Sequence, residues 1–422
     1  MKVLIYGMGR SGRAAARFAR ELDWDVQWMD QNPQPEDFEV ISRLSLLEGS
    51  PSRHFDWVVA APGVPIDHPD LQTLRRNQIP VIGELELGFM TRDVPIIGVT
   101  GTAGKGSTAH LIYQLLNASG VSASIGGNFD PPFLEVIDTA SVAVVEISSF
   151  QLERIRNFHP HIGVLTNLGV DHINRHGTVA SYHAAKLNLF RNMTPNDTAV
   201  FPKSIGHRIQ TSKQRPFDDQ PETLVDLDGK TIVTEWPDAH HPANLQAAVL
   251  ATLTHLEHLG VDSELGKAIS ELRPLEGRFH RLGMIGGIQF IEDSIATRTL
   301  AVQSALERSK APIVWILGGR DKGADLSPLM DIVRRKVAHI VGIGQDGAKL
   351  AREFGVPYSS VQPSGTGYDD MYLAAQIGLD CLGEEGTVLL APLCESFDQF
   401  KNYKDRARAF GQAFLRLQRE YS

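Results

Sequence analysis

Cysteine is scarce in this chain of 422 residues, which contains only Cys381 and Cys394. Two thiols cannot form a disulfide framework or a four-thiolate zinc site, so we expect a reducing compartment, the cytoplasm. Long hydrophobic runs are also missing, because no stretch approaches the roughly 18 uninterrupted apolar residues of a membrane span. The apolar run at residues 2–6 ends at Gly7 and is too short for a signal peptide, so it predicts a strand.

Positive charge is not in excess either. The chain has 41 basic and 50 acidic side chains, a net charge of −9. This balance argues against non-specific binding to nucleic acid or to an anionic membrane. We therefore expect small-molecule partners, anionic ones included, because a local positive pocket suffices for them, and we expect a monomer.

The remaining composition is that of an ordinary globular protein, with 42% hydrophobic and 22% charged residues. At about 150 residues per domain, the length predicts roughly two to four domains. Short β-branched runs alternate with helical patterns, which predicts an α/β protein with mainly parallel sheets. The clearest predicted strands are residues 2–6, 57–60, 96–100, 142–147, 162–166, 313–317, 339–343 and 387–391.

Two segments interrupt this alternation, and two others suggest domain boundaries. Residues 202–240 lack periodicity and predict a surface excursion with short strands. Residues 400–421 form an amphipathic basic pattern, which we interpret as a helix packed on its own domain in preference to a membrane-surface helix. We place the boundaries near 91–94, before a buried strand, and near 275–278, where Arg-Pro-Leu-Glu-Gly ends a helical pattern.

A first glycine-rich motif, residues 7–12, follows the first predicted strand, and Asp30 ends the second one. This is the layout of a dinucleotide-binding βαβ unit, in which glycines admit a pyrophosphate to the N-terminus of the next helix. Taken alone, the motif predicts a nicotinamide enzyme. The alternative is a tight turn that binds no ligand.

A second glycine-rich motif follows the strand at 96–100 and precedes a helical pattern at 110–117. Strand, glycines, lysine and helix together predict a loop that binds the β- and γ-phosphates of a nucleotide, with Lys105 as the point charge. Val99 stands where a strict nucleotide loop has its first glycine, and Gly106 stands where a hydroxyl normally binds Mg²⁺. The hydroxyl of Ser107 or that of Thr108, one or two residues further on, would replace it.

Four strings together resemble the Mur ligases, the ATP-dependent amide-forming enzymes of peptidoglycan synthesis. They are Gly-Thr-Ala-Gly-Lys at 101–105, Glu-Ile-Ser-Ser-Phe-Gln-Leu at 146–152, residues 167–172 and residues 182–186. The string Ser-Ser-Phe-Gln-Leu resembles the D-glutamate-adding branch of the family. The resemblance implies an N-terminal Rossmann-like domain at 1–92, a central P-loop ATPase-like domain at 93–276 and a C-terminal Rossmann-like domain at 277–422.

The resemblance also reassigns the first motif, because the family's N-terminal glycines hold a uridine diphosphate instead of NAD. The implied UDP-substrate residues are Gly9, Arg10, Ser11, Asp30, Gly63, Asn128 and Ser148. The implied ATP residues are Gly101, Thr102, Ala103, Gly104, Lys105, Gly106, Ser107, Thr108, Asn244, Arg281 and Asp293. The implied D-glutamate residues are Lys322, Ser396 and Tyr403.

Two Mg²⁺ ions are implied as well, held by Ser107, Glu146, His172 and Lys186, with Lys186 carbamylated in the family. A carbamate supplies the hard oxygen that Mg²⁺ prefers, whereas an ammonium repels the ion. The implied catalytic residues are Lys105, Glu146, His172 and Lys186.

Taken one at a time, these residues have simpler interpretations. His172 and His176 have a spacing that weakly suggests zinc, although no third soft ligand is evident. Lys186 would be a solvated helix lysine, and Arg281 a surface arginine. Asn128 would be a turn former, and Ser396 would cap a helix.

The pattern implies an enzyme that adds D-glutamate to a UDP-linked muramoyl-L-alanine through an acyl phosphate. Three alternatives remain: a related Mur-type or folylpolyglutamate-type ligase, a NAD-dependent oxidoreductase, and a silent UDP-sugar-binding relative. The last one rests on departures from the family pattern. These are Gly106, His241 in place of an asparagine and Ile295 in place of a lysine; Arg298 is a further departure, in place of an asparagine.

Overall fold

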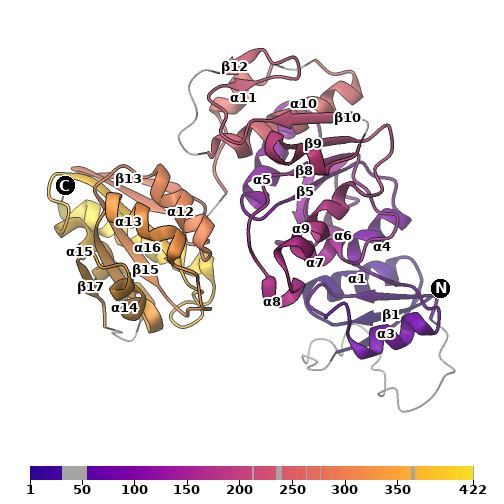
Figure 1. Ribbon diagram of the computed structural model, residues 1–422, viewed down its shortest axis with the longest axis horizontal. Helices are drawn as coiled ribbons and strands as arrows, with labels where there is room; N and C mark the ends of the chain where they lie inside the picture. The colour runs from indigo at the N-terminus through magenta and orange to yellow at the C-terminus, as the bar shows by residue number, and fades with distance from the viewer. Residues whose placement is uncertain are drawn as a thin grey trace. The chain divides into compact units, whose positions relative to one another are not determined.

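A computed structural model describes residues 1–30, 55–211, 213–233, 240–262, 264–275, 277–362 and 366–421 (Figure 1). The chain divides into two compact units, residues 1–272 and 273–422, and each is described by itself. Among the described residues, no helix combines the length and apolar character needed to cross a membrane.

The first sheet of unit 1 contains four parallel strands in the order β2-β1-β3-β4. Because β1 neighbours both β2 and β3, the strand order reverses at β1, and α/β proteins bind ligands at the carboxyl end of such a point. The strands are β1 Lys2–Tyr6, β2 Asp25–Met29, β3 Trp57–Ala60 and β4 Val81–Ile82. Their helices are α1 Arg10–Glu21, α3 Pro69–Arg76 and α4 Glu84–Thr91.

The second sheet of unit 1 has six parallel strands in the order β10-β9-β8-β5-β7-β6. The strands are β5 Ile96–Thr100, β6 Ala123–Gly127, β7 Val142–Glu146, β8 Ile162–Leu165, β9 Thr198–Pro202 and β10 Lys213–Phe217. Since β5 lies between β7 and β8, the loops after these three strands meet at one edge. That edge carries most of the motifs of the central sequence.

Helices cover both faces of this second sheet. On one face α5 and α10 pack over a shared apolar core, while α1, α4 and α6 lie between the two sheets (Figure 1). The core between the sheets is continuous and includes buried Trp28 and Phe133, which explains why residues 1–272 form one unit. The helices are α5 Lys105–Ala118, α6 Phe133–Val136, α7 Ser149–Leu152, α8 Ile173–His176, α9 Val179–Leu187, α10 Pro242–Leu259 and α11 Gly266–Ser270, with 3-10 turns η1 Asn188–Phe190 and η2 Lys203–Arg208.

The segment 202–240 differs in part from the predicted surface excursion. β10 is not peripheral, because it pairs with β9 as the edge strand of the second sheet. The short strands β11 (Leu224–Val225) and β12 (Thr231–Val233) do form a separate antiparallel pair. Residues 234–239 lie outside the described residues.

Unit 2 contains one six-stranded sheet in the order β13-β14-β18-β15-β16-β17, in which only β13 runs antiparallel. The strands are β13 His280–Ile285, β14 Gly287–Glu292, β15 Ile313–Gly318, β16 Val337–Ile343, β17 Tyr358–Ser360 and β18 Glu385–Leu393. The helices are α12 Thr299–Arg308, α13 Met330–Lys336, α14 Gly344–Glu353, α15 Gly367–Asp380 and α16 Tyr403–Tyr421, with the 3-10 turn η3 Ser327–Leu329.

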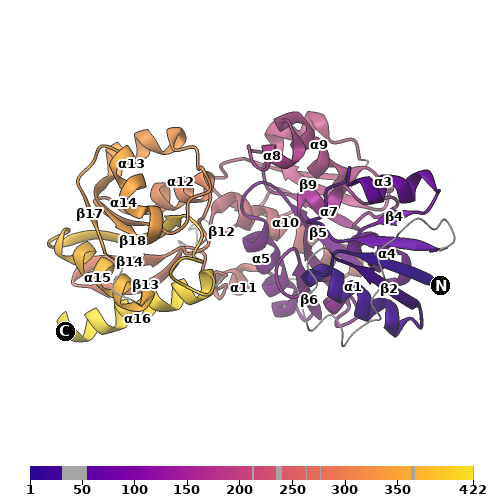
Figure 2. The same ribbon diagram turned by 90° about the horizontal axis from the view of Figure 1, so that it is seen from below.

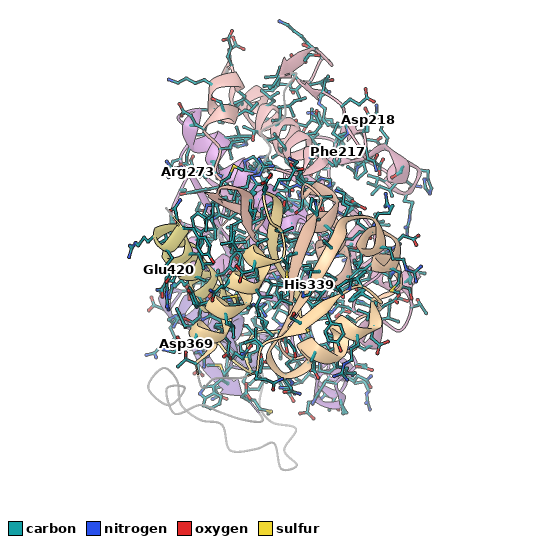
Figure 3. All side chains as sticks on the ribbon, turned by 90° about the vertical axis from the view of Figure 1, so that its left-hand side faces the viewer. Phe217, Asp218, Arg273, His339, Asp369 and Glu420 are labelled. Atoms are coloured by element: carbon teal, nitrogen blue, oxygen red, sulfur yellow. The ribbon has the colours of Figure 1, made fainter. Side chains whose placement is uncertain are left out.

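The C-terminal helix α16 packs on its own unit, as predicted from its amphipathic pattern (Figure 2). The ring of Phe290 in β14 lies 5.3 Å from that of Phe414, which places the apolar face of α16 on the sheet. On its outer side Glu420 accepts a hydrogen bond from Tyr372 of α15 at 2.6 Å. Figure 3 shows Glu420 and Asp369 on the helices at the margin of this unit and His339 on its sheet.

All eight predicted strands are confirmed, with ends that differ by four residues or fewer. They were predictable because buried parallel strands are continuous apolar runs. One local interpretation is wrong, however: Ser396 does not cap a helix, since α16 begins at Tyr403.

Candidate functional site

The second glycine-rich motif forms the loop between β5 and α5. Gly101 and Gly104 have φ values of +150° and +79°, which favour glycine. A Cβ on Gly101 would collide with Thr166 Oγ1, and one on Gly104 would collide with the side-chain amide of Asn244. Asn244, a predicted ATP residue in the first turn of α10, therefore lies against this loop.

Asn167 holds the loop in place from the end of β8. Its Oδ1 accepts the Ala103 N–H at 2.9 Å, and its Nδ2 donates to the Ala103 carbonyl at 3.0 Å. The Thr102 hydroxyl accepts from the Gly169 N–H at 2.8 Å and from the Tyr182 hydroxyl at 3.3 Å. The loop is thus shaped before any ligand arrives, and Asn167 is a contributor that the sequence analysis did not single out.

Two lysines converge on one carbonyl of this loop. Lys105 Nζ lies 2.9 Å and Lys186 Nζ 2.7 Å from the Gly101 oxygen. Lys186 is 2% exposed, and its Nζ lies 4.7 Å from the centre of the Tyr182 ring. Two ammonium groups beside the N-terminus of α5 give this edge of the sheet a concentrated positive charge, which suits polyanionic ligands.

Glu146 ends β7 and is 7% exposed. Its Oε1 accepts a hydrogen bond from Asn128 Nδ2 at 2.8 Å, and Asn128 N–H donates to its backbone carbonyl at 2.8 Å. Arg10 reaches across from α1 and donates to the Asn128 carbonyl at 2.9 Å. The predicted UDP-binding loop and the predicted metal carboxylate are therefore connected through one asparagine.

His172 occupies a strained backbone position with φ of +51°, immediately before α8. Its ring centre lies 4.8 Å from that of Phe150 and 6.3 Å from that of Tyr182, the ring that Lys186 also contacts. Left-handed backbone at a residue other than glycine persists only where the surroundings enforce it, and such residues gather at functional sites.

His176, in contrast, is held by two neighbouring side chains. Its Nδ1 lies 3.2 Å from a Glu153 oxygen and its Nε2 3.0 Å from the Ser149 hydroxyl. In the part of the chain that the structure describes, no group of three or more His, Cys, Asp or Glu side chains is placed to hold a metal ion. The zinc interpretation of His172 and His176 therefore has no support.

The first glycine-rich motif leads into α1, which begins at Arg10 with Gly9 as its N-cap and no side chain capping it. Asp30 fixes this loop, because its Oδ2 accepts the Met8 N–H at 2.5 Å. Ser11 lies in the first turn of α1. The amides of that turn are in the arrangement that binds phosphate at helix N-termini.

The last two predicted UDP residues, Gly63 and Ser148, lie in the loops that follow β3 and β7. Gly63 follows β3, and the next carbonyl, of Val64, accepts hydrogen bonds from Arg154 and Arg175. Ser148 caps α7 in a reciprocal box with Gln151, whose Oε1 accepts from the Ser148 N–H at 2.8 Å. Arg154, Arg175 and Gln151 thereby tie the first sheet to the second.

In unit 2 the predicted ATP residues lie on the β13–β14 hairpin. Arg281 is on β13, and Asp293 directly follows β14. Asp293 is 7% exposed, and its Oδ1 has no hydrogen-bond partner among the described residues. Burial raises the pKa of its carboxyl to about 7, against the lowering effect of Arg278.

Of the departures from the family pattern, His241 directly precedes α10, Ile295 follows Asp293 by two residues, and Arg298 directly precedes α12.

The predicted D-glutamate residues lie beyond the carboxyl ends of β15 and β18. Lys322 Nζ forms an ion pair with Glu395 Oε1 at 2.5 Å, and their side chains are 71% and 25% exposed. Ser396 is buried next to Glu395, and Tyr403 is the first residue of α16, where a Cβ placed on Gly277 would lie 3.4 Å from its ring. β15 and β18 are adjacent, so the two loops meet at the point where the strand order reverses.

Arg406 of α16 is a further residue that the sequence analysis missed. It is 1% exposed and donates to the carbonyls of Ser294 at 2.8 Å and Cys394 at 3.1 Å. Burial lowers the pKa of its guanidinium to about 10. By joining the segments after β14 and β18, Arg406 fixes the loops that carry Asp293 and Ser396.

Comparison with known proteins matches the N-terminal and central parts of the chain to two separate domain families. The family described as Mur ligase MurD-like, N-terminal domain, matches residues 1–83, and the Mur ligase middle domain matches residues 99–218. A UDP-N-acetylmuramoylalanine–D-glutamate ligase of Deinococcus radiodurans is 46% identical over 99% of this chain and 92% of its own length. The chain belongs to the Mur ligase family.

Other relatives support the same family assignment. A UDP-N-acetylmuramoylalanine–D-glutamate ligase (MurD) of Thermus thermophilus is 44% identical over 98% of this chain and 97% of its own length. Among solved structures, MurF ligase from Thermotoga maritima in complex with ADP has a TM-score of 0.60 at 15% identity, covering 100% of this chain and 95% of that one. MurC from Thermotoga maritima has a TM-score of 0.56 at 17% identity over 99% and 100% of the two chains. These two likenesses show the shared fold, a mixed α/β fold with several mainly parallel sheets.

Proposed function

We propose that this Mur ligase adds D-glutamate to UDP-N-acetylmuramoyl-L-alanine with hydrolysis of ATP to ADP and phosphate, a step of peptidoglycan synthesis. The observation that carries the proposal is the 44–46% identity to MurD ligases across almost the whole of both chains. The nicotinamide interpretation of residues 7–12 is not favoured, because residues 1–83 match a MurD-like N-terminal domain.

We keep the predicted domain bounds 1–92, 93–276 and 277–422, and we assign to each substrate the residues predicted for it. The UDP moiety binds at the first turn of α1 with Gly9, Arg10, Ser11, Asp30 and Gly63, and Asn128 and Ser148 bind the remainder of that substrate. ATP binds at the loop 101–108, with Asn244, Arg281 and Asp293. D-Glutamate binds through Lys322, Ser396 and Tyr403.

The reaction needs no nucleophile from the protein. The terminal carboxylate of the UDP substrate attacks the γ-phosphorus of ATP, forming an acyl phosphate and releasing ADP. The amine of D-glutamate then attacks the acyl carbon, and the tetrahedral intermediate loses phosphate while the nitrogen loses a proton. Lys105 stabilises the charge of the transferred phosphoryl group, and the site excludes water because an acyl phosphate hydrolyses readily.

The residues of the site fit Mg²⁺. Glu146 is a buried carboxylate whose only hydrogen-bond partner for its side chain, within the described residues, is the neutral amide of Asn128. An anion in that position suits a hard divalent cation, which binds few carboxylates and otherwise uses phosphate oxygens and water. When bound, the ion neutralises charge on the phosphates. Ser107 is the better-exposed hydroxyl for it, since Thr108 is fully buried.

We assign a second Mg²⁺ to His172 and a carbamylated Lys186. Lys186 is buried with its Nζ beside Lys105 on the Gly101 carbonyl, where a second positive charge is unfavourable. A carbamate would turn one of these two cations into an anion. The strained His172 and Lys186 share the neighbour Tyr182, whose ring centre lies 6.3 Å from that of His172 and 4.7 Å from Lys186 Nζ.

The direct test is phosphate release from ATP with Mg²⁺ and UDP-N-acetylmuramoyl-L-alanine. We expect release with D-glutamate and little with L-glutamate, D-alanine, L-lysine or no amino acid. Release with a different amino acid would reassign the chain to another ligase of the family. No release with any amino acid, from protein that binds the UDP substrate, would identify a silent relative, with Gly106, His241 and Ile295 as the first residues to restore.

Replacing Glu395 with glutamine is expected to lower KM for D-glutamate about two- to fivefold and to leave kcat unchanged. Glu395 pairs with Lys322 at 2.5 Å and therefore competes with the substrate carboxylate for the same ammonium. An exposed pair of this kind contributes about 0.2–1 kcal/mol, which sets the size of the effect. Steady-state kinetics with varied D-glutamate measures it.

The matched control is Glu385→Gln, which breaks the exposed pair of Glu385 with Lys310 at 2.8 Å, away from the proposed site. That variant should keep the KM of the parent protein. An unchanged or higher KM in Glu395→Gln would remove Glu395 from D-glutamate binding.

A further inference from the structure

A buried carboxyl without a role in the reaction lies behind the first turn of α1. Glu84, the first residue of α4, is 2% exposed. Its Oε1 accepts a hydrogen bond from Gln151 Nε2 at 2.6 Å, whereas its Oε2 is buried and has no hydrogen-bond partner among the residues that the structure describes. An ionised carboxylate in that condition is costly, since half of its acceptor capacity is unused away from water.

The elements packed on α4 supply few charges to Glu84. From α1 come the Ser11 hydroxyl and the charge of Arg10, from α7 the Gln151 amide, and from α6 the repelling carboxylate of Glu135. Burial raises the pKa of Glu84 to about 7, although Gln151, Ser11 and Arg10 oppose this shift. Near neutral pH the carboxyl is therefore divided between its acid and its anion.

Glu86, two residues along the same helix, shows the contrast. Its oxygens accept the backbone N–H groups of Arg156, Asn157 and Phe158 at 2.7, 2.9 and 3.0 Å. Glu86 is therefore a buried carboxylate whose oxygens are satisfied by hydrogen-bond donors, and its role is structural. Glu84 faces the turn where a ligand is expected and lacks such donors.

We propose that Glu84 takes up a proton when the diphosphate of the UDP substrate binds at the first turn of α1, and that it positions this substrate through Ser11. The proposal rests on the proposed function, which places the diphosphate there. The Ser11 hydroxyl is close enough to Glu84 to lower the pKa of its carboxyl, so the Glu84 anion attracts the Ser11 hydrogen. When Glu84 is an acid, its Oε2–H turns toward Ser11 Oγ, and the Ser11 hydrogen is free to turn toward a phosphate oxygen.

The direction of the pH effect follows from charge. Two phosphate charges near α1 disfavour the Glu84 anion, so the pKa of Glu84 is higher in the complex than in the free protein. Affinity for the UDP substrate is therefore complete below about pH 7 and is lost as the pH rises through the pKa of the complex. A fraction of a proton, at most one, is taken from solvent on binding and returned when the product leaves.

Calorimetry with UDP-N-acetylmuramoyl-L-alanine between about pH 6 and about pH 8.5 tests this, since no carboxylate or phosphodiester of the substrate titrates in that window. For the wild-type protein we expect a five- to tenfold loss of affinity across the window. A difference of one pH unit in pKa corresponds to a tenfold change. Glu84→Gln, which mimics the neutral acid, should bind at the low-pH wild-type affinity throughout.

Glu86→Gln is the control for loss of a buried carboxylate. It should unfold more easily than the parent and yet keep the pH dependence of substrate binding. The wild-type protein alone gives a second readout, because proton uptake changes the binding enthalpy between buffers of different ionisation enthalpy. Binding without such uptake overturns the proposal even if Glu84→Gln does not fold.

The outcomes separate the two proposals. Binding without proton uptake, or a pH profile that Glu84→Gln does not flatten, would overturn the role of Glu84 and leave the ligase function intact. No binding of the UDP substrate at any pH would overturn both.

Discussion

Replacing Lys105 with alanine should lower turnover by about 10²–10³-fold and leave the fold intact. Lys105 Nζ donates to the Gly101 and Thr102 carbonyls at 2.9 and 3.2 Å at the edge of the sheet, so its loss removes little packing. In the reaction the same ammonium faces developing phosphoryl charge in a site shaped in advance, where one donor contributes about 10²–10³ in rate. Phosphate release measures turnover, and circular dichroism with urea measures stability.

Lys203→Ala is the matched control, because Lys203 is an exposed lysine paired with Asp218 at 2.8 Å. It should match the parent in both assays. Near-normal turnover in Lys105→Ala would contradict the placement of ATP at residues 101–108.

Replacing Arg406 with methionine should destabilise unit 2 by about 3 kcal/mol or more. The guanidinium donates to the Ser294 and Cys394 carbonyls at 2.8 and 3.1 Å, and methionine fills similar space without a donor. Hydrogen bonds from a charged group contribute about 1.5–3 kcal/mol each, and the carbonyls would stay buried and unsatisfied. Trp315, the one tryptophan in the sequence from 273 to 422 and fully buried in β15, reports urea unfolding of this unit by fluorescence.

Arg416→Met is the control on the same helix, since Arg416 is 59% exposed, pairs with Glu420 at 3.0 Å and lies 3.8 Å from the centre of the Tyr372 ring. Its effect should stay within about 1 kcal/mol, the range of an exposed i,i+4 pair together with an exposed cation–π contact. An equal effect of the two substitutions would show that the buried guanidinium does not hold the β14 and β18 segments together.

Local sequence predicted the secondary structure well for a physical reason. Buried parallel strands occur in the sequence as continuous apolar runs, such as Ile96–Thr100 and Ile313–Gly318, and glycines occur in the loops that follow them. Predictions were weaker where local signals are ambiguous. β10, Lys213–Phe217, is largely polar because it is an edge strand, and Ser396 resembled a helix cap although its helix begins at Tyr403.

Parts of the candidate site could also be predicted one residue at a time. Gly101, Gly104 and Lys105 predict a phosphate-binding loop, because binding of phosphate by such a loop requires these residue types in this order along the chain. Asn167, Glu395 and Arg406 carry no such local signal, since each acts on a segment distant in sequence. Glu84 had a weak one: two glutamates stand in the otherwise apolar stretch 81–89, where a charge requires a partner.

The sequence by itself determined the α/β class, the strands, the glycine-rich loop after β5 and the family, because each depends on residues close together in the chain. Only the tertiary structure decided which groups meet. It placed the Lys105 and Lys186 ammonium groups on one carbonyl and Glu395 on Lys322. It also left one oxygen of Glu84 without a hydrogen-bond partner within the described part of the chain. Burial and charge at these points arise from strands that pair across long intervals of sequence, and no local pattern encodes that pairing.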